Sequence, residues 1–198
     1  MPFTIGILLY PGAEELDWAG PFEVFSIATA GVDDARVVTL AERPEPVRSW
    51  NGLRVLPDYE IARAPDLDLI VVPGGFGTRE EMDNPVLVDW LAQIGPNCTW
   101  IASVCTGSLL LHAAGLTHGK QITTHWAVIE ELRNLAPEAT VLEGMRYVRD
   151  GNLVTAAGVS AGIDMSLWLV GQIWDVERAR NTQRMMEYDP APPYAAQV

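Results

Sequence analysis

The sequence predicts an α/β fold built on a mainly parallel sheet that helices cover on both faces. Short, continuously apolar runs alternate along the chain with longer helix-like segments. An apolar run without polar alternation is typical of a strand buried on both sides, as the strands of parallel sheets are. The length of 198 residues suits one domain with a sizeable core, and no repeat or linker divides it. We therefore expect a single domain over residues 1–198.

Seven segments are predicted as strands. They are residues 3–9, 35–41, 52–56, 69–72, 99–104, 145–149 and 153–156. The turn sequence YPG ends the first strand, and PGG ends the fourth. The last two strands flank Asp150-Gly151, which is a strong hairpin signal, so these two are expected to form a hairpin.

Five segments are predicted as helices, besides a sixth that follows Gly107. The five are residues 14–30, 84–94, 124–135, 160–174 and 176–186. Pro21 lies inside the first, where a proline can break or restart a helix, whereas Pro85 suits the first turn of the second. A threonine is available to cap the third helix, and Ser160 can cap the fourth. The proline-rich tail from about residue 189 is expected to lie extended.

The residues around Cys105 follow one another in the order of a nucleophile elbow. An apolar strand ends at Cys105, Gly107 permits a sharp turn, and an apolar helix-like segment follows. In such a turn the side chain points out of the fold, and the free N–H groups at the helix start favour thiolate over thiol. A lone cysteine is more often a small core residue, but this context favours a reactive thiol.

Composition and charge exclude several classes of partner. The formal net charge is −13 and the pI is near 4.5. Such a surface repels phosphate backbones and anionic lipids, so we expect neither a nucleic acid nor a membrane partner. We see no bilayer-spanning run and no signal peptide. Cys98 and Cys105 would stand at opposite ends of one strand, too far apart for a disulfide, which favours the cytoplasm as the location.

Other candidate site residues follow the predicted strands, because functional groups gather at the carboxyl ends of parallel strands. Asp17, next to Trp18, can act as a general acid or base facing the cysteine, although a first-turn or N-cap acid is the commoner role there. Gly75 lies in a glycine-rich segment that either presents backbone N–H groups, as an oxyanion hole does, or is a plain turn. His125 is the histidine we consider for a Cys–His pair. We find no zinc-site spacing and no G-x-S-x-G motif.

Further segments stand in an informative order along the chain. They are Leu16-Asp17 with Pro21, Pro73-Gly74-Gly75, the elbow SVCTGS, Gly115-Leu116, Gly119-Lys120, TTHW at 123–126, VRDGNL at 148–153, AGID at 161–164, and Glu187-Tyr188 with APP at 191–193. Together they resemble the DJ-1/PfpI (ThiJ) superfamily over residues 5–194, and more narrowly its isocyanide (isonitrile) hydratase branch. The threonine after the cysteine differs from the histidine of the protease-like PfpI branch, and Asp17 stands where DJ-1 itself has a glutamate.

This resemblance implies a flavodoxin-like three-layer sandwich and a cofactor-independent hydro-lyase. Members of the hydratase branch convert an isocyanide and water to an N-substituted formamide through a cysteine thioimidate. Carried onto this chain, Cys105 is the nucleophile and Asp17 the acid or base, and Thr106 helps to hold Asp17 or the intermediate.

The substrate pocket, with any oxyanion contacts, is expected to include Gly75, Gly158, Trp18 and His125. We expect no metal and no cofactor. The implied partners are a small isocyanide, water and a second copy of the chain, since the branch is homodimeric with its active site near the interface.

Two alternative functions remain for the same fold. A DJ-1-like glyoxalase or stress-response protein shares the reactive cysteine, so only substrate assays separate it from a hydratase. The domain also resembles the sensor half of AraC-type regulators. Those carry a helix-turn-helix after it, whereas this chain stops at Val198, and the acidic balance argues against direct DNA contact.

Overall fold

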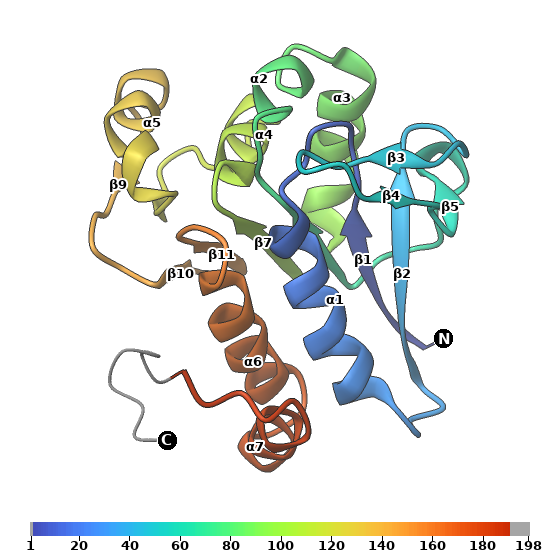
Figure 1. The fold of residues 1–198 in the computed structure, drawn as a ribbon. Coiled ribbons are helices and arrows are strands. Elements are labelled where there is room, and N and C mark those ends of the chain that lie inside the picture. Colours follow the sequence, from blue (N-terminus) through green and yellow to red (C-terminus); the bar gives the residue numbers. More distant parts are fainter. Residues whose placement is uncertain (1, 191–198) are drawn as a thin grey trace.

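A seven-stranded sheet forms the middle layer of the molecule in a computed structural model that describes residues 2–190 (Figure 1). Its strands, in spatial order, are β10 (Tyr147–Asp150), β11 (Leu153–Ala156), β7 (Trp100–Val104), β6 (Leu69–Val72), β1 (Phe3–Leu8), β2 (Ala35–Ala41) and β5 (Tyr59–Glu60). Every neighbouring pair is parallel except β10 and β11, which form the predicted antiparallel hairpin. The mainly parallel sheet predicted from the sequence is confirmed.

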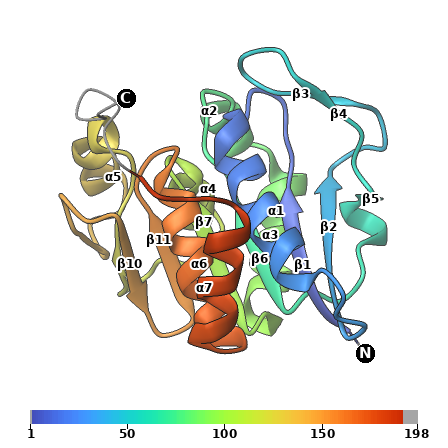
Figure 2. The ribbon, with the colours of Figure 1, turned by 60° about the horizontal axis from the view of Figure 1, so that its bottom comes forward.

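Helices cover both faces of this sheet, as predicted (Figure 2). One face carries α1 (Glu15–Thr29), α6 (Ala161–Ile173) and α7 (Val176–Met185), which pack against one another. The other face carries α3 (Pro85–Ile94) and α4 (Gly107–Ala113), with the single turn of α2 (Thr78–Glu81) against α4. A smaller unit, α5 (Ile129–Leu135) with β8 (Gln121–Ile122) and β9 (Thr140–Val141), adjoins the β10 edge.

The central strands are mostly apolar because both of their faces are covered, with Thr4, Ser103 and Thr155 as buried exceptions. Every residue of β6 and β11 is buried, as are the last five residues of β1. Burying a valine, leucine or isoleucine side chain contributes roughly 1.5–3 kcal/mol, so such strands favour apolar side chains. The parallel order of β1, β6 and β7 also brings the segments that follow them to one edge of the sheet.

The predicted strand over residues 52–56 is largely wrong. Only β4 (Arg54–Val55) is extended there, and it pairs with β3 (Val47–Arg48) outside the main sheet. Leu53 and Leu56 are 56% and 66% exposed, so this apolar run does not enter the core. A run of five residues does not reveal which face it covers, because that depends on the neighbours it meets.

The helix predicted over residues 124–135 begins later than expected. A 3₁₀ turn spans Trp126–Val128, and α5 starts only at Ile129. Thr124 does not cap this helix, because its hydroxyl donates to the backbone carbonyl of Cys105 at 2.8 Å. His125 takes the capping place before the 3₁₀ turn, where its Nδ1 accepts from the Ala127 N–H.

Among the other helices for which the sequence gives an end or break signal, the outcomes differ. Pro85 occupies the first turn of α3, and the Asn84 side chain caps that helix. Pro21 lies inside α1 without ending it. Ser160 stands at the N-cap of α6 but makes no capping bond, and its hydroxyl contacts Arg146 instead.

The predictions for the proline-rich tail and for a bilayer-spanning segment can be compared with the structure only over residues 2–190. Asp189 and Pro190 belong to neither a helix nor a strand, and the rest of the proline-rich tail lies outside residues 2–190. Within that range, no helix combines the length and apolar content that crossing a bilayer requires.

Candidate active site

Cys105 occupies the sharp turn between β7 and α4. Its backbone has a φ of 56°, a region that side-chain-bearing residues rarely adopt and that costs about 1–3 kcal/mol. The surrounding contacts hold this conformation. The Cys105 N–H donates to the carbonyls of Ala156 and Ala157, and its carbonyl accepts from the hydroxyls of Thr124 and Ser108.

Gly107 allows the helix after Cys105 to start directly against the sheet. A Cβ at this position would collide with the carbonyl oxygen of Val72 on β6. Only glycine lets α4 approach β6 so closely, and the closeness makes the turn at Cys105 tight. The sequence signal of a glycine two residues after the cysteine therefore has a steric cause.

Asp17 lies in the first turn of α1 and is completely buried. Its Oδ2 accepts the backbone N–H of Gly74 at 2.9 Å. Its Oδ1 is buried and has no hydrogen-bond partner among the described residues. The Cys105 thiol is a close neighbour, since the two side chains interact and each alters the pKa of the other.

Burial dominates the proton affinities of this pair. It raises the pKa of Asp17 from 3.8 to about 7, against the lowering effect of the Gly74 N–H, and the charge of Glu14 raises it further. Burial, followed by the negative charge of Asp17, raises the pKa of Cys105 to about 12. The predicted resting thiolate is therefore not supported. Hydrogen bonds from the backbone and side chain of Thr106 lower the pKa of Cys105, but they do not outweigh burial and the Asp17 charge.

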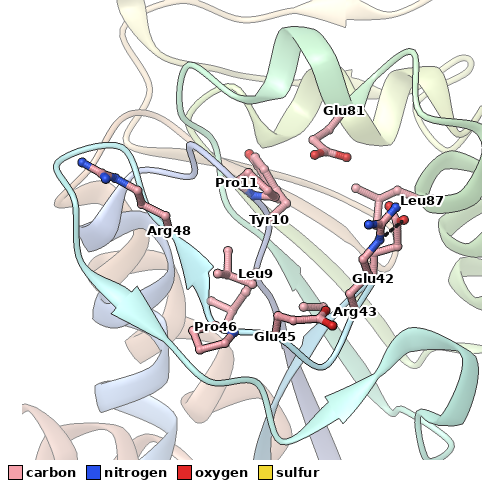
Figure 3. Close-up of a pocket in the computed structure, with 12 residues that line it drawn as sticks. Leu9, Tyr10, Pro11, Glu42, Arg43, Glu45, Pro46, Arg48, Glu81 and Leu87 are labelled. Carbon is pink, nitrogen blue, oxygen red and sulfur yellow. Dashed lines mark hydrogen bonds and ion pairs between the residues drawn. The ribbon is translucent and has the colours of Figure 1, made fainter.

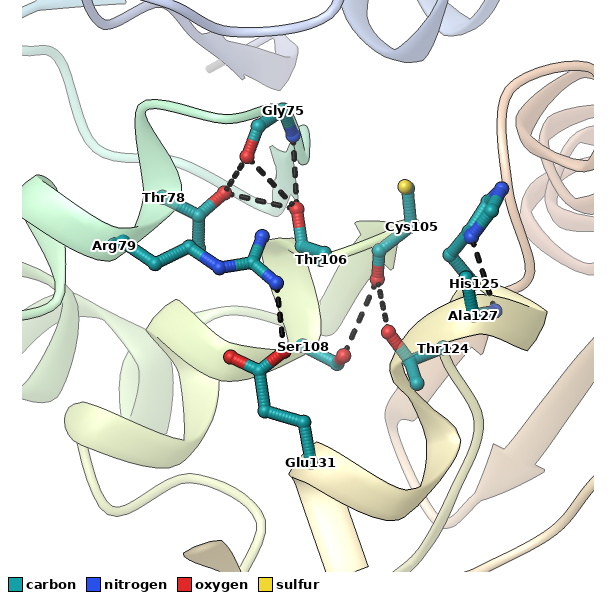
Figure 4. A network of polar contacts seen from close by, with 10 residues as sticks. All are labelled: Gly75, Thr78, Arg79, Cys105, Thr106, Ser108, Thr124, His125, Ala127 and Glu131. Carbon is teal, nitrogen blue, oxygen red and sulfur yellow. Dashed lines mark hydrogen bonds and ion pairs between the residues drawn. The ribbon is translucent and has the colours of Figure 1, made fainter.

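Thr106 binds the glycine-rich segment and not Asp17. Its Oγ1 accepts the Gly75 N–H at 2.8 Å and lies 3.1 Å from the Gly75 carbonyl (Figure 4). The Thr78 hydroxyl lies 2.9 Å from it. Gly75 has a φ of 132°, so this close approach depends on glycine.

A cavity of about 350 Å³ opens beside Cys105. Its lining combines apolar and charged groups: Glu14, Gly75, Phe76, Arg79, Cys105, Thr106, His125, Ala127, Val128, Glu131 and Val159. Arg79 and Glu131 form an ion pair at 2.7 Å across it, so the guanidinium charge is already balanced (Figure 4). The cavity suits a small, uncharged molecule.

The remaining predicted pocket residues fall in different places. His125 lines the cavity with Cys105, but Nδ1 of its ring binds the Ala127 N–H, and burial lowers its pKa. Gly158 does not line the cavity and packs against the His125 ring, where a Cβ would collide. Trp18 is buried away from the lining and donates its indole N–H to Ser49.

Comparison with known proteins identifies the family. The sequence profile of the DJ-1/PfpI family matches residues 4–172, most of the chain. The chain belongs to the DJ-1/PfpI family. An isonitrile hydratase of Pseudomonas putida is 39% identical over 194 residues, which cover 98% of this chain and 82% of that protein. The HTH-type transcriptional regulator CdhR of Pseudomonas aeruginosa is 31% identical over 166 residues, which cover 83% of this chain and 49% of the regulator.

Solved structures of the family share the fold. A THiJ/PfpI family protein from Pseudomonas syringae superposes with a TM-score of 0.90 at 36% identity, covering 100% of this chain and 80% of that one. DJ-1beta of Drosophila melanogaster reaches a TM-score of 0.85 at 22% identity, covering 96% of this chain and 100% of that one, and this likeness concerns the fold alone.

Sequence reasoning missed three charged residues and one aromatic residue of this DJ-1/PfpI cavity, besides the aliphatic Ala127, Val128 and Val159. Glu14 and Phe76 follow the carboxyl ends of β1 and β6, and Arg79 lies just beyond Phe76. Glu131 gave no signal, because α5 is distant in sequence and only the tertiary fold brings it to the cysteine.

A second cavity, of about 540 Å³, opens at the carboxyl ends of β1 and β2 (Figure 3). Its lining includes Glu42, Arg43, Glu45 and Glu81 but no cysteine and no histidine. Over residues 2–190, no group of three or more His, Cys, Asp or Glu side chains is placed to hold a metal ion. The candidate nucleophile and the candidate histidine therefore line the cavity beside Cys105 and not this second cavity.

Proposed function

We propose that this DJ-1/PfpI protein is an isonitrile hydratase, with Cys105 as nucleophile and Asp17 as acid and base. One observation carries the proposal. Asp17 has a buried oxygen without a partner beside the Cys105 thiol, and the cysteine lines a cavity suited to a small neutral molecule. The 39% identity to an isonitrile hydratase along nearly the whole chain supports the substrate class.

The first step adds the thiol to the terminal carbon of the isocyanide. Because the pKa of Cys105 is high, its thiol is neutral at rest and must lose its proton as it attacks. Asp17, with a pKa of about 7, takes that proton and passes it to the same carbon. The S–H bond breaks, S–C and C–H bonds form, and the product is a thioimidate.

The second step uses water. A water molecule adds to the imidate carbon, one of its protons reaches the nitrogen through Asp17, and the S–C bond breaks. Sulfur recovers the other proton, and an N-substituted formamide leaves. Over both steps one isocyanide and one water become one formamide, and both side chains return to their starting states. A carboxyl with a pKa near neutrality can perform both transfers.

We also propose that the protein works as a homodimer in the cytoplasm without a cofactor. The resemblance to the hydratase branch supports this, and sedimentation equilibrium measures the assembly state directly. A mass near 43 kDa, twice the 21.7 kDa of one chain, agrees with it, whereas a monomer at micromolar concentration contradicts it.

Formamide production tests the function. Purified protein and the Cys105→Ala variant are mixed with a simple aromatic isocyanide, and formamide absorbance is followed. We expect turnover by the wild type alone, with circular dichroism showing that both proteins are folded. Turnover by the variant would reject Cys105 as nucleophile. Consumption of methylglyoxal without formamide from any isocyanide would favour a glyoxalase.

A further inference from the structure

Three buried hydroxyl groups form a row behind the site. The proposed reaction uses none of them directly. Tyr10, Thr78 and Thr106 are each at most 3% exposed. The Tyr10 hydroxyl lies 3.1 Å from that of Thr78, which in turn lies 2.9 Å from that of Thr106. Figure 4 shows the last two with Gly75, and Figure 3 shows Tyr10 at the wall of the second cavity.

The row holds a segment of backbone that touches both proposed catalytic residues. The Pro73 carbonyl accepts from the Tyr10 hydroxyl at 2.6 Å. The Gly74 N–H donates to Asp17, and the Gly74 carbonyl accepts the Glu14 N–H at 2.8 Å. A side chain at Gly74 would collide with the cysteine turn, so this peptide lies directly against the elbow.

Gly75 makes the hydrogen bonds that join the hydroxyl row to the Pro73–Gly75 backbone. Its carbonyl accepts from Thr78 at 2.7 Å and lies 3.1 Å from the Thr106 hydroxyl, while its N–H donates to Thr106. Neither Gly74 nor Gly75 has a side chain of its own with which to hold this conformation. Their positions therefore depend on groups supplied by the segment after β1, by α2 and by the cysteine turn.

A count of protons identifies the central member of the row. Each hydroxyl has one proton, and that of Tyr10 goes to the Pro73 carbonyl. The one proton of Thr78 goes to the Gly75 carbonyl at 2.7 Å, and its oxygen can accept from Thr106. Tyr10, at 3.1 Å, is then a neighbour of Thr78 and not a second acceptor of its proton. Burial raises the pKa of Tyr10 well above its ordinary value, so this anchor stays protonated.

We propose that Thr78, with the Tyr10 hydroxyl holding the adjacent Pro73 carbonyl, is a positioning residue that holds the Gly74–Gly75 peptide against Thr106 and so aims the Gly74 N–H at Asp17. The inference rests on the proposed function for its kinetic consequence but not for its structural one. Without the Thr78 hydroxyl, the Gly75 carbonyl loses its shortest donor. The Gly74 N–H then stabilises the Asp17 carboxylate less, and the pKa of Asp17 rises.

Substitutions at Thr78 separate this role from plain packing. Thr78→Val keeps the shape and removes the hydroxyl, Thr78→Ser keeps the hydroxyl, and Tyr10→Phe removes only the anchor. Thr39→Val is the matched control, because Thr39 is also buried and its hydroxyl donates to Asp58 at 2.8 Å on β2, outside the cavity lining.

The first readout is the pKa of Asp17 itself, from ¹³C NMR titration of aspartate-labelled protein, with the signal assigned through Asp17→Asn. We expect Thr78→Val to raise this pKa by about half a pH unit and Tyr10→Phe to raise it less. Thr78→Ser and Thr39→Val should leave it unchanged. If Thr78→Val does not fold, Tyr10→Phe and Thr78→Ser still decide the question.

The second readout is turnover. We expect Thr78→Val to lower kcat about tenfold with little change in KM, to move the acid limb of the pH profile upward, and Thr78→Ser to restore both. An unchanged pKa of Asp17 in Thr78→Val, or an equal effect of Thr39→Val, overturns the proposal. If the wild type hydrates no isocyanide, the proposed function fails while the NMR titration still tests the positioning role.

Discussion

At the scale of single residues, Asp17 and Cys105 owe their unusual proton affinities to a shared buried place. A carboxyl in water ionises near pH 4, but burial makes Asp17 hold its proton to about pH 7 even though the Gly74 N–H donates to it. The resulting acid is matched to transferring protons at neutral pH. The same burial raises the pKa of the Cys105 thiol, so in the proposed reaction this thiol depends on Asp17 to become a nucleophile.

Asp17 therefore destabilises the folded protein when it is ionised. Its folded pKa is raised above the unfolded value, so the stability it contributes is complete below about pH 4 and is lost as the pH rises toward 7. We expect Asp17→Asn to be more stable than the wild type at pH 8, by on the order of 4 kcal/mol at most, with the difference closing toward pH 4. Urea unfolding at pH 4, 6 and 8 measures this. A difference that does not vary with pH would contradict the raised pKa.

The same variant, Asp17→Asn, should raise the reactivity of the Cys105 thiol toward alkylation while it lowers the hydration activity. Removing the Asp17 charge lowers the pKa of Cys105, so alkylation of Cys105 by iodoacetamide at pH 8 should be about tenfold faster while hydration is lost. Peptide mass mapping separates Cys105 from Cys98. Glu81→Gln is the control, since this half-buried carboxyl has a raised pKa but lies outside the cysteine cavity, and it should leave alkylation unchanged.

At the scale of elements, the approach of α4 to β6 sets the geometry of the cysteine turn. Gly107→Ala places a methyl group against the carbonyl oxygens of Val72 and Pro73, which are backbone atoms that cannot move aside cheaply. We expect a loss of about 3 kcal/mol or more in unfolding free energy, together with loss of turnover.

Gly171→Ala is the matched control for that experiment. Gly171 lies inside α6, where a Cβ would meet the Ala179 side chain at 3.6 Å and the Val176 Cα at 4.0 Å, both ordinary contacts. Because alanine is the better helix former, we expect unchanged or slightly higher stability, by up to about 1 kcal/mol. Equal effects of the two substitutions in chemical denaturation would reject a steric role for Gly107.

Elements were predictable from sequence where their burial is uniform. The strands β1, β6 and β7 are continuous apolar runs, and α3 has a proline start, so local pattern and tertiary position agree. The predictions of a strand at 52–56 and of a helix starting at 124 were wrong because local pattern and tertiary position disagree there. There, the exposure of Leu53 and the hydrogen bonding of Thr124 depend on residues far along the chain. For Thr124, that partner is the carbonyl of Cys105.

At the scale of the whole molecule, the net charge of −13 disfavours contact with polyanions such as nucleic acids. A relative such as the regulator CdhR is twice as long as the segment shared with this chain. We expect no shift of duplex DNA in gel electrophoresis even at 50 mM salt, because phosphates are repelled where no basic surface offsets them. Binding that weakens steeply as salt rises would overturn this expectation and favour a regulator.

The sequence by itself determined the α/β class, the parallel sheet and the family, because those follow from apolar periodicity and from short motifs around Cys105 and Asp17. Only the tertiary structure decided how the site works. Burial of Asp17, its unpartnered oxygen and the neutral thiol arise from what packs around them. The hydrogen bond from Thr78 to Gly75 likewise belongs to a network of residues that the strand order brings together. Proton affinity and hydrogen-bond partners depend on the whole surroundings of a group, and a linear pattern does not record those surroundings.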